Sequence, residues 1–297
     1  FERDVRLTVG SINTGYRRFM DIAAIAMAKS GSCNVDTICS QGDGWRNEIP
    51  SVAVISTGGS RFCTGFMVNN VRQDLTPYFQ TAFHCRVTAS HAASLVCFWN
   101  FENTTCRTPG STASGSTGNG SLTQFNTGST FRAGYSPSDV TLVQLSQTPN
   151  PAWKVSYAGW DARSIETTSN VGIHHPNTDE KRISFDNNPS TTTSYNSATS
   201  PGDGTHIRVG NWELGTTEGG SSGSPLFNQD HRVVGQLHGG SASCTSVTND
   251  FYGRMSVSWL GGGTAATQLK TWLDPDNTGT LFIDTRTTGG LSVSPSS

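Results

Sequence analysis

The sequence predicts an all-β protein made of short antiparallel strands. From about residue 49 onward, short runs of alternating apolar and polar residues are separated by clusters of Gly, Asn, Ser and Pro, a pattern typical of a barrel or a sandwich. A helical pattern is clear only near the C-terminal end. At 297 residues, the chain can bury a large core, either as one domain with two lobes or as two small domains.

The predicted strands follow an N-terminal stretch with little recognisable pattern. Residues 1–32 are expected to be an N-terminal arm or a residual pro-segment, with a possible short helix over residues 17–29 that lacks clear caps. Because the chain begins with Phe1 rather than Met, we expect it to have been cut from a longer precursor. Strands are predicted at residues 51–55, 62–68 and 94–99.

Two polar segments are predicted to form loops. Residues 108–130 are rich in Gly, Ser and Thr and come before a strand that opens at Asp139. Residues 191–204 have a similar composition and form the second loop.

Two prolines mark the expected boundary between lobes. Pro149 and Pro151 interrupt strand pairing. We therefore expect an N-terminal lobe over residues 33–150 and a C-terminal lobe over residues 151–297. The second lobe would end with a short helix over residues 264–273, which the Asp-Pro pair that follows would stop.

Composition excludes several classes of function. Charged residues make up 14% of the chain and the net charge is −2, so no strong field favours nucleic acid or an anionic membrane. No apolar run reaches the length of a membrane span. Seven cysteines without a Cys-x-x-Cys pair favour disulfides in an oxidising compartment over zinc ligation. We expect no metal and no cofactor.

A glycine-rich segment carries the candidate nucleophile. Residues 217–225 read TEGGSSGSP, and glycines there would let backbone N–H groups converge on one point. Taken alone, such a segment is more often a linker. His84 after an apolar strand and Asp139 at the start of another favour catalysis, because a serine needs a base to take its proton and a carboxylate to orient that base.

Several segments together resemble one protease family. The segments TAFHC (residues 81–85), DVTL (139–142) and GSSGSP (220–225) resemble the signatures of chymotrypsin-fold serine proteases. The chain is similar in more detail to bacterial lysyl endopeptidases. That similarity is carried by GSCNVD (31–36), HHPN (174–177), EKRIS (180–184), GQLHGG (235–240) and WLDP (272–275).

The resemblance implies a fold and an activity. The expected fold is a chymotrypsin-like double antiparallel β-barrel with a short C-terminal helix. The expected activity is a secreted, extracellular bacterial serine endopeptidase that cuts on the carboxyl side of Lys through an acyl-enzyme. His84, Asp139 and Ser222 would form the triad, and the N–H groups of Gly220 and Ser222 would form the oxyanion hole.

The resemblance also implies how substrate is recognised. Trypsin-like enzymes place an acid six residues before the nucleophile, but that position is Thr216 here. Asp250 is expected instead to bind the substrate ammonium. His238, Gly239 and Gly240 would pair with the substrate backbone. The family places a Trp next to the histidine, yet residues 193–198 contain none, so Tyr195 is expected to stand in.

The family's disulfide pattern implies which cysteines pair. It joins Cys33 to Cys244, Cys39 to Cys106 and Cys63 to Cys85, and leaves Cys97 as a buried, inert thiol. Ser221 stands where many trypsin relatives have the aspartate that receives a freed N-terminal ammonium, so we expect that activation switch not to operate.

Two alternatives remain open at this stage. One is an enzyme with Arg or mixed basic specificity, because pocket depth depends on loop geometry. The other is a chymotrypsin-fold binding module without catalysis. The expected partners are polypeptides with Lys before the scissile bond, with no nucleic acid and no membrane, and the expected state is a monomer.

Overall fold

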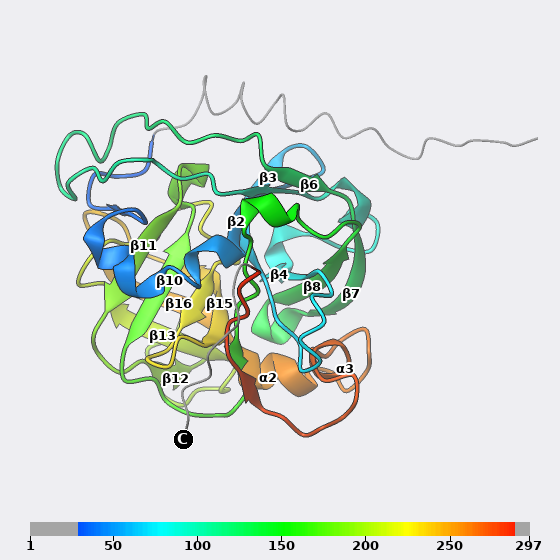
Figure 1. Cartoon of the computed structure of the whole chain (residues 1–297). Helices are drawn as coiled ribbons and strands as arrows, with labels where there is room; N and C mark the ends of the chain where they lie inside the picture. Colours follow the sequence, from blue (N-terminus) through cyan, green and yellow to red (C-terminus); the bar gives the residue numbers. More distant parts are fainter. Residues whose placement is uncertain (1–28, 289–297) are drawn as a thin grey trace, which may run out of the picture.

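Two antiparallel sheets make up most of the computed structural model, which describes residues 29–288 (Figure 1). One sheet has seven strands in the order β6-β5-β2-β3-β4-β8-β7. The other has ten strands, with the main path β1-β11-β10-β14-β15-β16-β13-β12 and with β9 and β17 attached. The two sheets lie beside each other and both curl (Figure 1). The predicted all-β class with two barrels is confirmed.

The seven-stranded sheet uses the predicted alternating segments. Its two ends meet at Gly128, the residue between β6 and β7. The Gly128 N–H donates to the Leu95 carbonyl at 2.8 Å on the β5 side, and its carbonyl accepts from the Ser146 N–H at 3.0 Å on the β8 side. All its strand pairings are antiparallel, and the strands expected near residues 51, 62 and 94 are confirmed. The strands are β2 (Val52–Thr57), β3 (Arg61–Met67), β4 (Tyr78–Ala82), β5 (Val96–Trp99), β6 (Phe125–Thr127), β7 (Ser129–Tyr135) and β8 (Val140–Leu145).

The ten-stranded sheet gathers short segments from both ends of the described chain. Its pairings are antiparallel except that β9 runs parallel to β15. The strands are β1 (Val35–Asp36), β9 (Trp160–Asp161), β10 (Asn170–His174), β11 (Arg182–Asp186), β12 (Thr191–Thr193), β13 (His206–Asn211), β14 (Pro225–Phe227), β15 (Val233–Gly240), β16 (Thr248–Arg254) and β17 (Phe282–Ile283). The expected boundary between lobes near residue 150 stays a prediction. Strand β1, which precedes that boundary in the sequence, pairs with β11 of this sheet.

The helices differ from the sequence prediction. In place of one helix over residues 264–273, the structure has α2 (Met255–Leu260) and α3 (Lys270–Leu273). Gly261 adopts a positive φ of 42° and ends α2, and hydrogen bonds between the Thr264 and Thr267 side chains hold the following residues in turns. The helix considered at residues 17–29 falls almost wholly outside the described residues. Neither α2 nor α3 has the length or apolarity to cross a membrane, nor has any other helix in residues 29–288.

Short 3₁₀ turns connect many of the strands. Two of them, Phe83–Cys85 and Ser136–Ser138, adjoin candidate site residues. The others are Ser40–Trp45, Ile49–Ser51, Ala92–Ser94, Pro151–Trp153 and Pro176–Thr178.

The two sheets share a continuous apolar core and a set of polar contacts. Phe66 and Leu142 of the first sheet lie in the same buried cluster as Ile173 and Phe227 of the second. Gln236 on β15 accepts from Gln80 on β4 at 3.1 Å and donates to the Ser138 carbonyl at 2.7 Å. Because these contacts join β4 and the start of β8 to β15, they fix the relative position of the segments that carry His84, Asp139 and Ser222.

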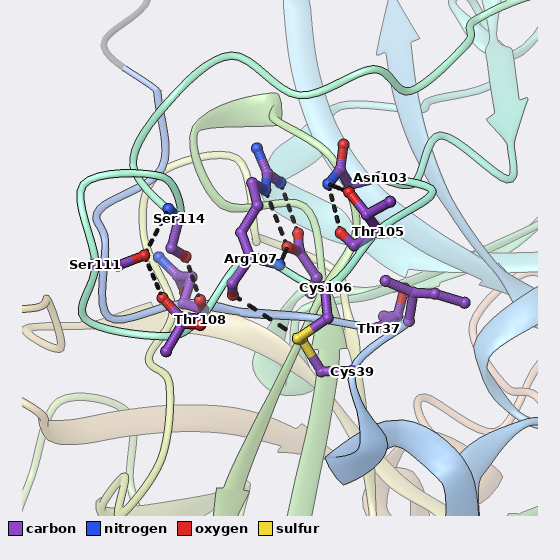
Figure 2. Close-up of a disulfide and its surroundings, with 12 residues drawn as sticks. Thr37, Cys39, Asn103, Thr105, Cys106, Arg107, Thr108, Ser111 and Ser114 are labelled. Atoms are coloured by element: carbon purple, nitrogen blue, oxygen red, sulfur yellow. Dashed lines mark hydrogen bonds and ion pairs between the residues drawn. A yellow bond between two sulfur atoms is a disulfide. The ribbon is translucent and has the colours of Figure 1, made fainter.

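A long connection and two of the three disulfides attach the N-terminal segment to the rest. The connection between β5 and β6, residues 100–124, reaches from the first sheet toward β11 of the second (Figure 1). Figure 2 shows the Cys39–Cys106 disulfide that fastens it, with Arg107 beside it. Arg107 forms buried ion pairs with Asp36 at 2.6 Å and Glu180 at 2.7 Å. The other disulfides are Cys33–Cys244 and Cys63–Cys85, and Cys97 is a free, buried thiol. Burial raises the pKa of that thiol well above its ordinary value.

Candidate active site

Two adjacent strands bring His84 and Asp139 together. His84 lies in the 3₁₀ turn that follows β4, and Asp139 precedes β8, which pairs with β4. His84 Nδ1 lies 2.7 Å from Asp139 Oδ2, and the His84 backbone N–H donates to Oδ1 at 2.9 Å. The carboxylate is buried while 38% of the imidazole side chain is exposed. Since a carboxylate only accepts, the ring carries its proton on Nδ1 and leaves Nε2 free as a base.

The glycine-rich loop with Ser222 lies against the first sheet beside His84. Thr64 on β3 donates its N–H to the Ser222 carbonyl at 2.8 Å and its hydroxyl to the Gly220 carbonyl at 2.9 Å. The Cys85 sulfur lies 3.8 Å from the same Ser222 oxygen. Ser222 is half-buried, and its hydroxyl makes no hydrogen bond to His84 within the described residues. That contact is often long before substrate binds.

The loop conformation leaves two backbone N–H groups without acceptors. Gly220 has a φ of +88°, and a Cβ there would lie 2.8 Å from the Thr178 nitrogen, so glycine is required. Ser221 N–H donates to the Glu218 carbonyl and Gly223 N–H to the Leu237 carbonyl. The N–H groups of Gly220 and Ser222 have no acceptor anywhere in residues 29–288. Unpaired N–H groups are rare in folded proteins, and these two can bind a substrate oxygen.

A buried histidine supports this loop from behind. His174 on β10 contacts the Ser221 hydroxyl through Nδ1 at 2.9 Å and the Ser184 hydroxyl through Nε2 at 2.9 Å. Ser184 in turn donates to the Thr216 carbonyl at 3.1 Å. This donor order satisfies a neutral imidazole. Burial, assisted by the nearby Arg182 charge, lowers the pKa of His174 to about 3, so the ring stays neutral.

Asp250 lies on β16, between β13 and β15, with no counter-charge among the described residues. Its side chain is 1% exposed, and Oδ2 accepts from Trp212 Nε1 and from the Thr217 hydroxyl, both at 2.6 Å. No basic side chain of residues 29–288 lies within 4.0 Å of it. Burial raises the pKa of Asp250 to about 6, although the hydrogen bonds from Thr217, Trp212 and the Ala242 backbone oppose the shift. Above pH 6 this is a buried, unpaired anion that favours a cation.

Gly240 keeps the space next to Asp250 open. It pairs with Asp250 across β15 and β16, and a Cβ on Gly240 would collide with Asp250 Oδ1. A Cβ on Gly239 would come within 3.2 Å of the Tyr195 hydroxyl. Both glycines therefore permit a close approach to the carboxylate and to Tyr195.

An aromatic stack covers the His84–Asp139 pair. The Tyr195 ring stacks on His238 with centroids 3.6 Å apart and an interplanar angle of 11°. His238 stacks on His84 at 5.3 Å and 20°, and its Nε2 lies 3.8 Å from Asp139 Oδ2. Tyr195 therefore lies next to His238, the position at which a Trp was expected from the family resemblance but is missing from the sequence.

Within residues 29–288, two groups of donor atoms lie close enough together to suggest a metal site, and neither suits a metal. Cys63 and Cys85 lie near His84 but are joined in a disulfide. His84, Asp139 and His238 place donor atoms within 4.8 Å of one another. The two imidazoles are nearly parallel, however, so their in-plane lone pairs do not converge on one ion.

Comparison with known proteins identifies the family. The family model described as "Lysyl endopeptidase, C-terminal domain" matches residues 27–253. This chain belongs to the lysyl endopeptidase family. The lysyl endopeptidase of Pseudomonas aeruginosa is 32% identical over 277 residues, which cover 85% of this chain and 56% of that protein. The chain thus spans about half the length of that relative.

Solved structures with related folds are more distant. One titled as a Glu endopeptidase in complex with MPD has 15% identity and a TM-score of 0.45, covering 72% of this chain and 88% of its own. One titled HBP has 16% identity and a TM-score of 0.47, covering 71% and 88%.

Membership of the lysyl endopeptidase family confirms the resemblance found in the motifs. Within that family setting, three side chains near the site were not singled out from the sequence. Trp212 resembles any core aromatic residue, Thr217 was one polar residue within the glycine-rich segment, and His206 was isolated in a polar stretch. The pairing of β13 with β16 and of β16 with β15 brings His206 to the site, whereas Trp212 and Thr217 reach it through their hydrogen bonds to Asp250.

Proposed function

We propose that this chain is a secreted serine endopeptidase that hydrolyses peptide bonds on the carboxyl side of Lys through a Ser222-His84-Asp139 triad and an acyl-enzyme. The observation that carries the reaction is the 2.7 Å contact between His84 Nδ1 and Asp139 Oδ2 beside a loop with two unpaired N–H groups. The specificity rests on the buried Asp250 carboxylate.

The reaction proceeds in two steps. His84 Nε2 takes the Ser222 proton as Oγ attacks the substrate carbonyl, and Asp139 stabilises the resulting imidazolium. The imidazolium then gives its proton to the leaving amine as the C–N bond breaks, which leaves an ester on Ser222. Water, deprotonated by His84, attacks that ester and releases the acid, and the proton returns to Ser222 Oγ.

The oxyanion of both tetrahedral intermediates would bind to the N–H groups of Gly220 and Ser222. Removal of one such donor costs about 3–4 kcal/mol of transition-state stabilisation in a related site. The cost is high because donors already oriented in the free enzyme need no reorganisation during the reaction. The positive-φ conformation of Gly220, packed closely against Thr178, supports this role.

The surroundings of Asp250 favour Lys over Arg. A guanidinium binds best when both carboxylate oxygens are free for parallel hydrogen bonds. Oδ2 of Asp250 already accepts from Trp212 and Thr217, which hinders that bidentate geometry. A Lys ammonium is a compact charge that needs no such pair of oxygens.

Secretion and partners follow from the same chemistry. Three disulfides suit an oxidising, extracellular compartment. The expected partners are polypeptides with Lys before the cut, acted on by a monomer.

The test uses two peptides that differ only in having Lys or Arg before the scissile bond, with the Ser222→Ala variant as the inactive control. We expect cleavage after Lys to exceed cleavage after Arg by about 10²-fold. Equal cleavage of both peptides would establish mixed basic specificity instead. No cleavage of either, together with no labelling by a serine-directed phosphonate, would establish a binding module.

A further inference from the structure

A series of hydrogen bonds leads from Asp203 at the surface through Thr205 and His206 to His238, which lies next to the Asp139 carboxylate. His206 opens β13 and is buried. Its Nε2 lies 2.9 Å from His238 Nδ1, and its Nδ1 lies 2.7 Å from the Thr205 hydroxyl. Thr205 contacts Asp203 Oδ1 at 2.7 Å. On the inner side, His238 Nε2 lies 3.8 Å from Asp139 Oδ2.

The Asp203 carboxylate, the outermost group, determines which atom donates and which accepts in each of these hydrogen bonds. An ionised carboxylate only accepts, so the Thr205 hydroxyl donates to Asp203. The hydroxyl oxygen is then an acceptor for His206, which must carry its proton on Nδ1. A neutral His206 with that tautomer has a bare Nε2 and accepts from His238. The proton of His238 is therefore held on Nδ1.

We propose that Asp203, Thr205 and His206 position the proton of His238 on Nδ1, so that its bare Nε2 faces Asp139 and leaves that carboxylate to His84. Thr205 and His206 act as positioning residues, because they reach the reacting groups only through His238. The inference deepens the proposed function and rests on the triad chemistry described above.

The orientation of the His238 dipole affects how well the charged form of His84 is stabilised during catalysis. With Nε2 bare, the negative end of the imidazole dipole points toward the His84–Asp139 pair and favours the imidazolium formed in the transition state. With the opposite tautomer, a His238 N–H would point at Asp139 Oδ2 and compete with the His84 N–H for the same oxygen. The groups that face His238 are Asp139, His84, His206 and Tyr195.

The ionisation of these groups agrees with this order. Burial, together with the neighbouring His238, lowers the pKa of His206 to about 4. Burial also lowers the pKa of His238, although the Asp139 charge opposes the shift. Hydrogen bonds from the Thr205 backbone and hydroxyl lower the pKa of Asp203. Near neutral pH both imidazoles are therefore neutral and Asp203 is ionised, as the donor order requires.

The decisive variant is Thr205→Val, with Thr205→Ser as its matched control. Valine offers no acceptor, so His206 would shift its proton to Nε2 and donate to His238, and His238 would then carry its proton on Nε2. Nitrogen NMR of ¹⁵N-histidine-labelled protein distinguishes the two tautomers, with Ser222→Ala as background to prevent self-digestion. We expect the Nδ1–H form of His238 in the parent and in Thr205→Ser, and the Nε2–H form in Thr205→Val.

Kinetics provide the second readout on the active chain. For Thr205→Val we expect kcat to fall about five- to tenfold, the size of one hydrogen bond at the pair, with KM unchanged. The acidic limb of the kcat/KM profile should move to lower pH, because a less stabilised imidazolium loses its proton more readily. His206→Gln keeps an acceptor for His238 and should retain more activity than His206→Leu.

The experiments test the His238 tautomer and the proteolytic activity separately. An active parent in which Thr205→Val changes neither the His238 tautomer nor the pH profile would overturn this inference and leave the proposed function standing. A parent that cleaves nothing would overturn the proposed function, while the NMR result would still decide the tautomer. If Thr205→Val does not fold, the His206→Gln and His206→Leu pair carries the same comparison.

Discussion

Replacing Asp250 with Asn should weaken catalysis and strengthen the fold. Asparagine has the same shape and keeps an oxygen for Trp212 and Thr217, but it removes the charge that would bind the substrate ammonium. Loss of one partner of a buried charge pair costs about 3–5 kcal/mol. We therefore expect kcat/KM for a Lys peptide to fall about 10²–10⁴-fold, and most of the preference for Lys over an uncharged side chain to disappear.

The effect on stability follows from the raised pKa of Asp250. The folded state ionises this group near pH 6, whereas its ordinary pKa is 3.8, so between these values the folded state binds more protons. Ionisation therefore destabilises the free protein as pH rises through this window, by about 3 kcal/mol above pH 6, and has no effect below pH 4. Asp250→Asn should remove this loss.

Urea unfolding at pH 4 and pH 8 in the Ser222→Ala background measures the difference. We expect the Asp250→Asn variant to gain stability over the parent at pH 8 and not at pH 4. Asp186→Asn is the matched control for activity, because Asp186 is a buried carboxyl on β11 whose pKa burial also raises but which lies outside the proposed pocket, so its replacement should leave cleavage of Lys peptides unchanged. An Asp250→Asn variant that is less stable at pH 8, or that cleaves Lys peptides at the parental rate, would refute the reasoning.

Two further predictions concern the groups around the triad. Burial lowers the pKa of His174 to about 3, so this group contributes stability that is present above about pH 6.5 and is lost as pH falls toward 3. His174→Gln should therefore show a smaller drop in the urea midpoint between pH 6.5 and pH 4 than the parent. An equal drop in both proteins would contradict this. Tyr195→Ala removes the ring stacked 3.6 Å from His238 and should lower kcat/KM about two- to tenfold. Tyr195→Trp keeps an aromatic ring there and should retain activity. Equal rates for Tyr195→Ala and the parent would show that the stack has no catalytic role.

The strands of the first sheet were predictable because alternation and turn residues mark them locally. Two-residue strands such as β1 and β17 carry too little pattern, and they form only because partner strands lie beside them. Helix α2 was missed because it continues directly from β16 without a turn signal. The predicted helix over residues 264–273 was mostly wrong, since Thr side chains hydrogen-bond locally there and favour turns.

The site shows the same division between local and long-range information. Motifs singled out His84, Asp139, Ser222 and Asp250 because each lies in a segment with its own signature. His206 has no local signature. Its meeting with His238 depends on the register that sets His206 opposite Gly253 and Gly253 opposite Gln236, and register across three strands cannot be deduced from one sequence.

Mass spectrometry of the chain after reaction with a phosphonate that carries a Lys side chain tests the central claim most directly. Activation of one hydroxyl by His84 predicts a single adduct on Ser222, and Ser222→Ala should abolish it. An adduct on Ser221 or Ser224, or none on a folded chain, would contradict the account.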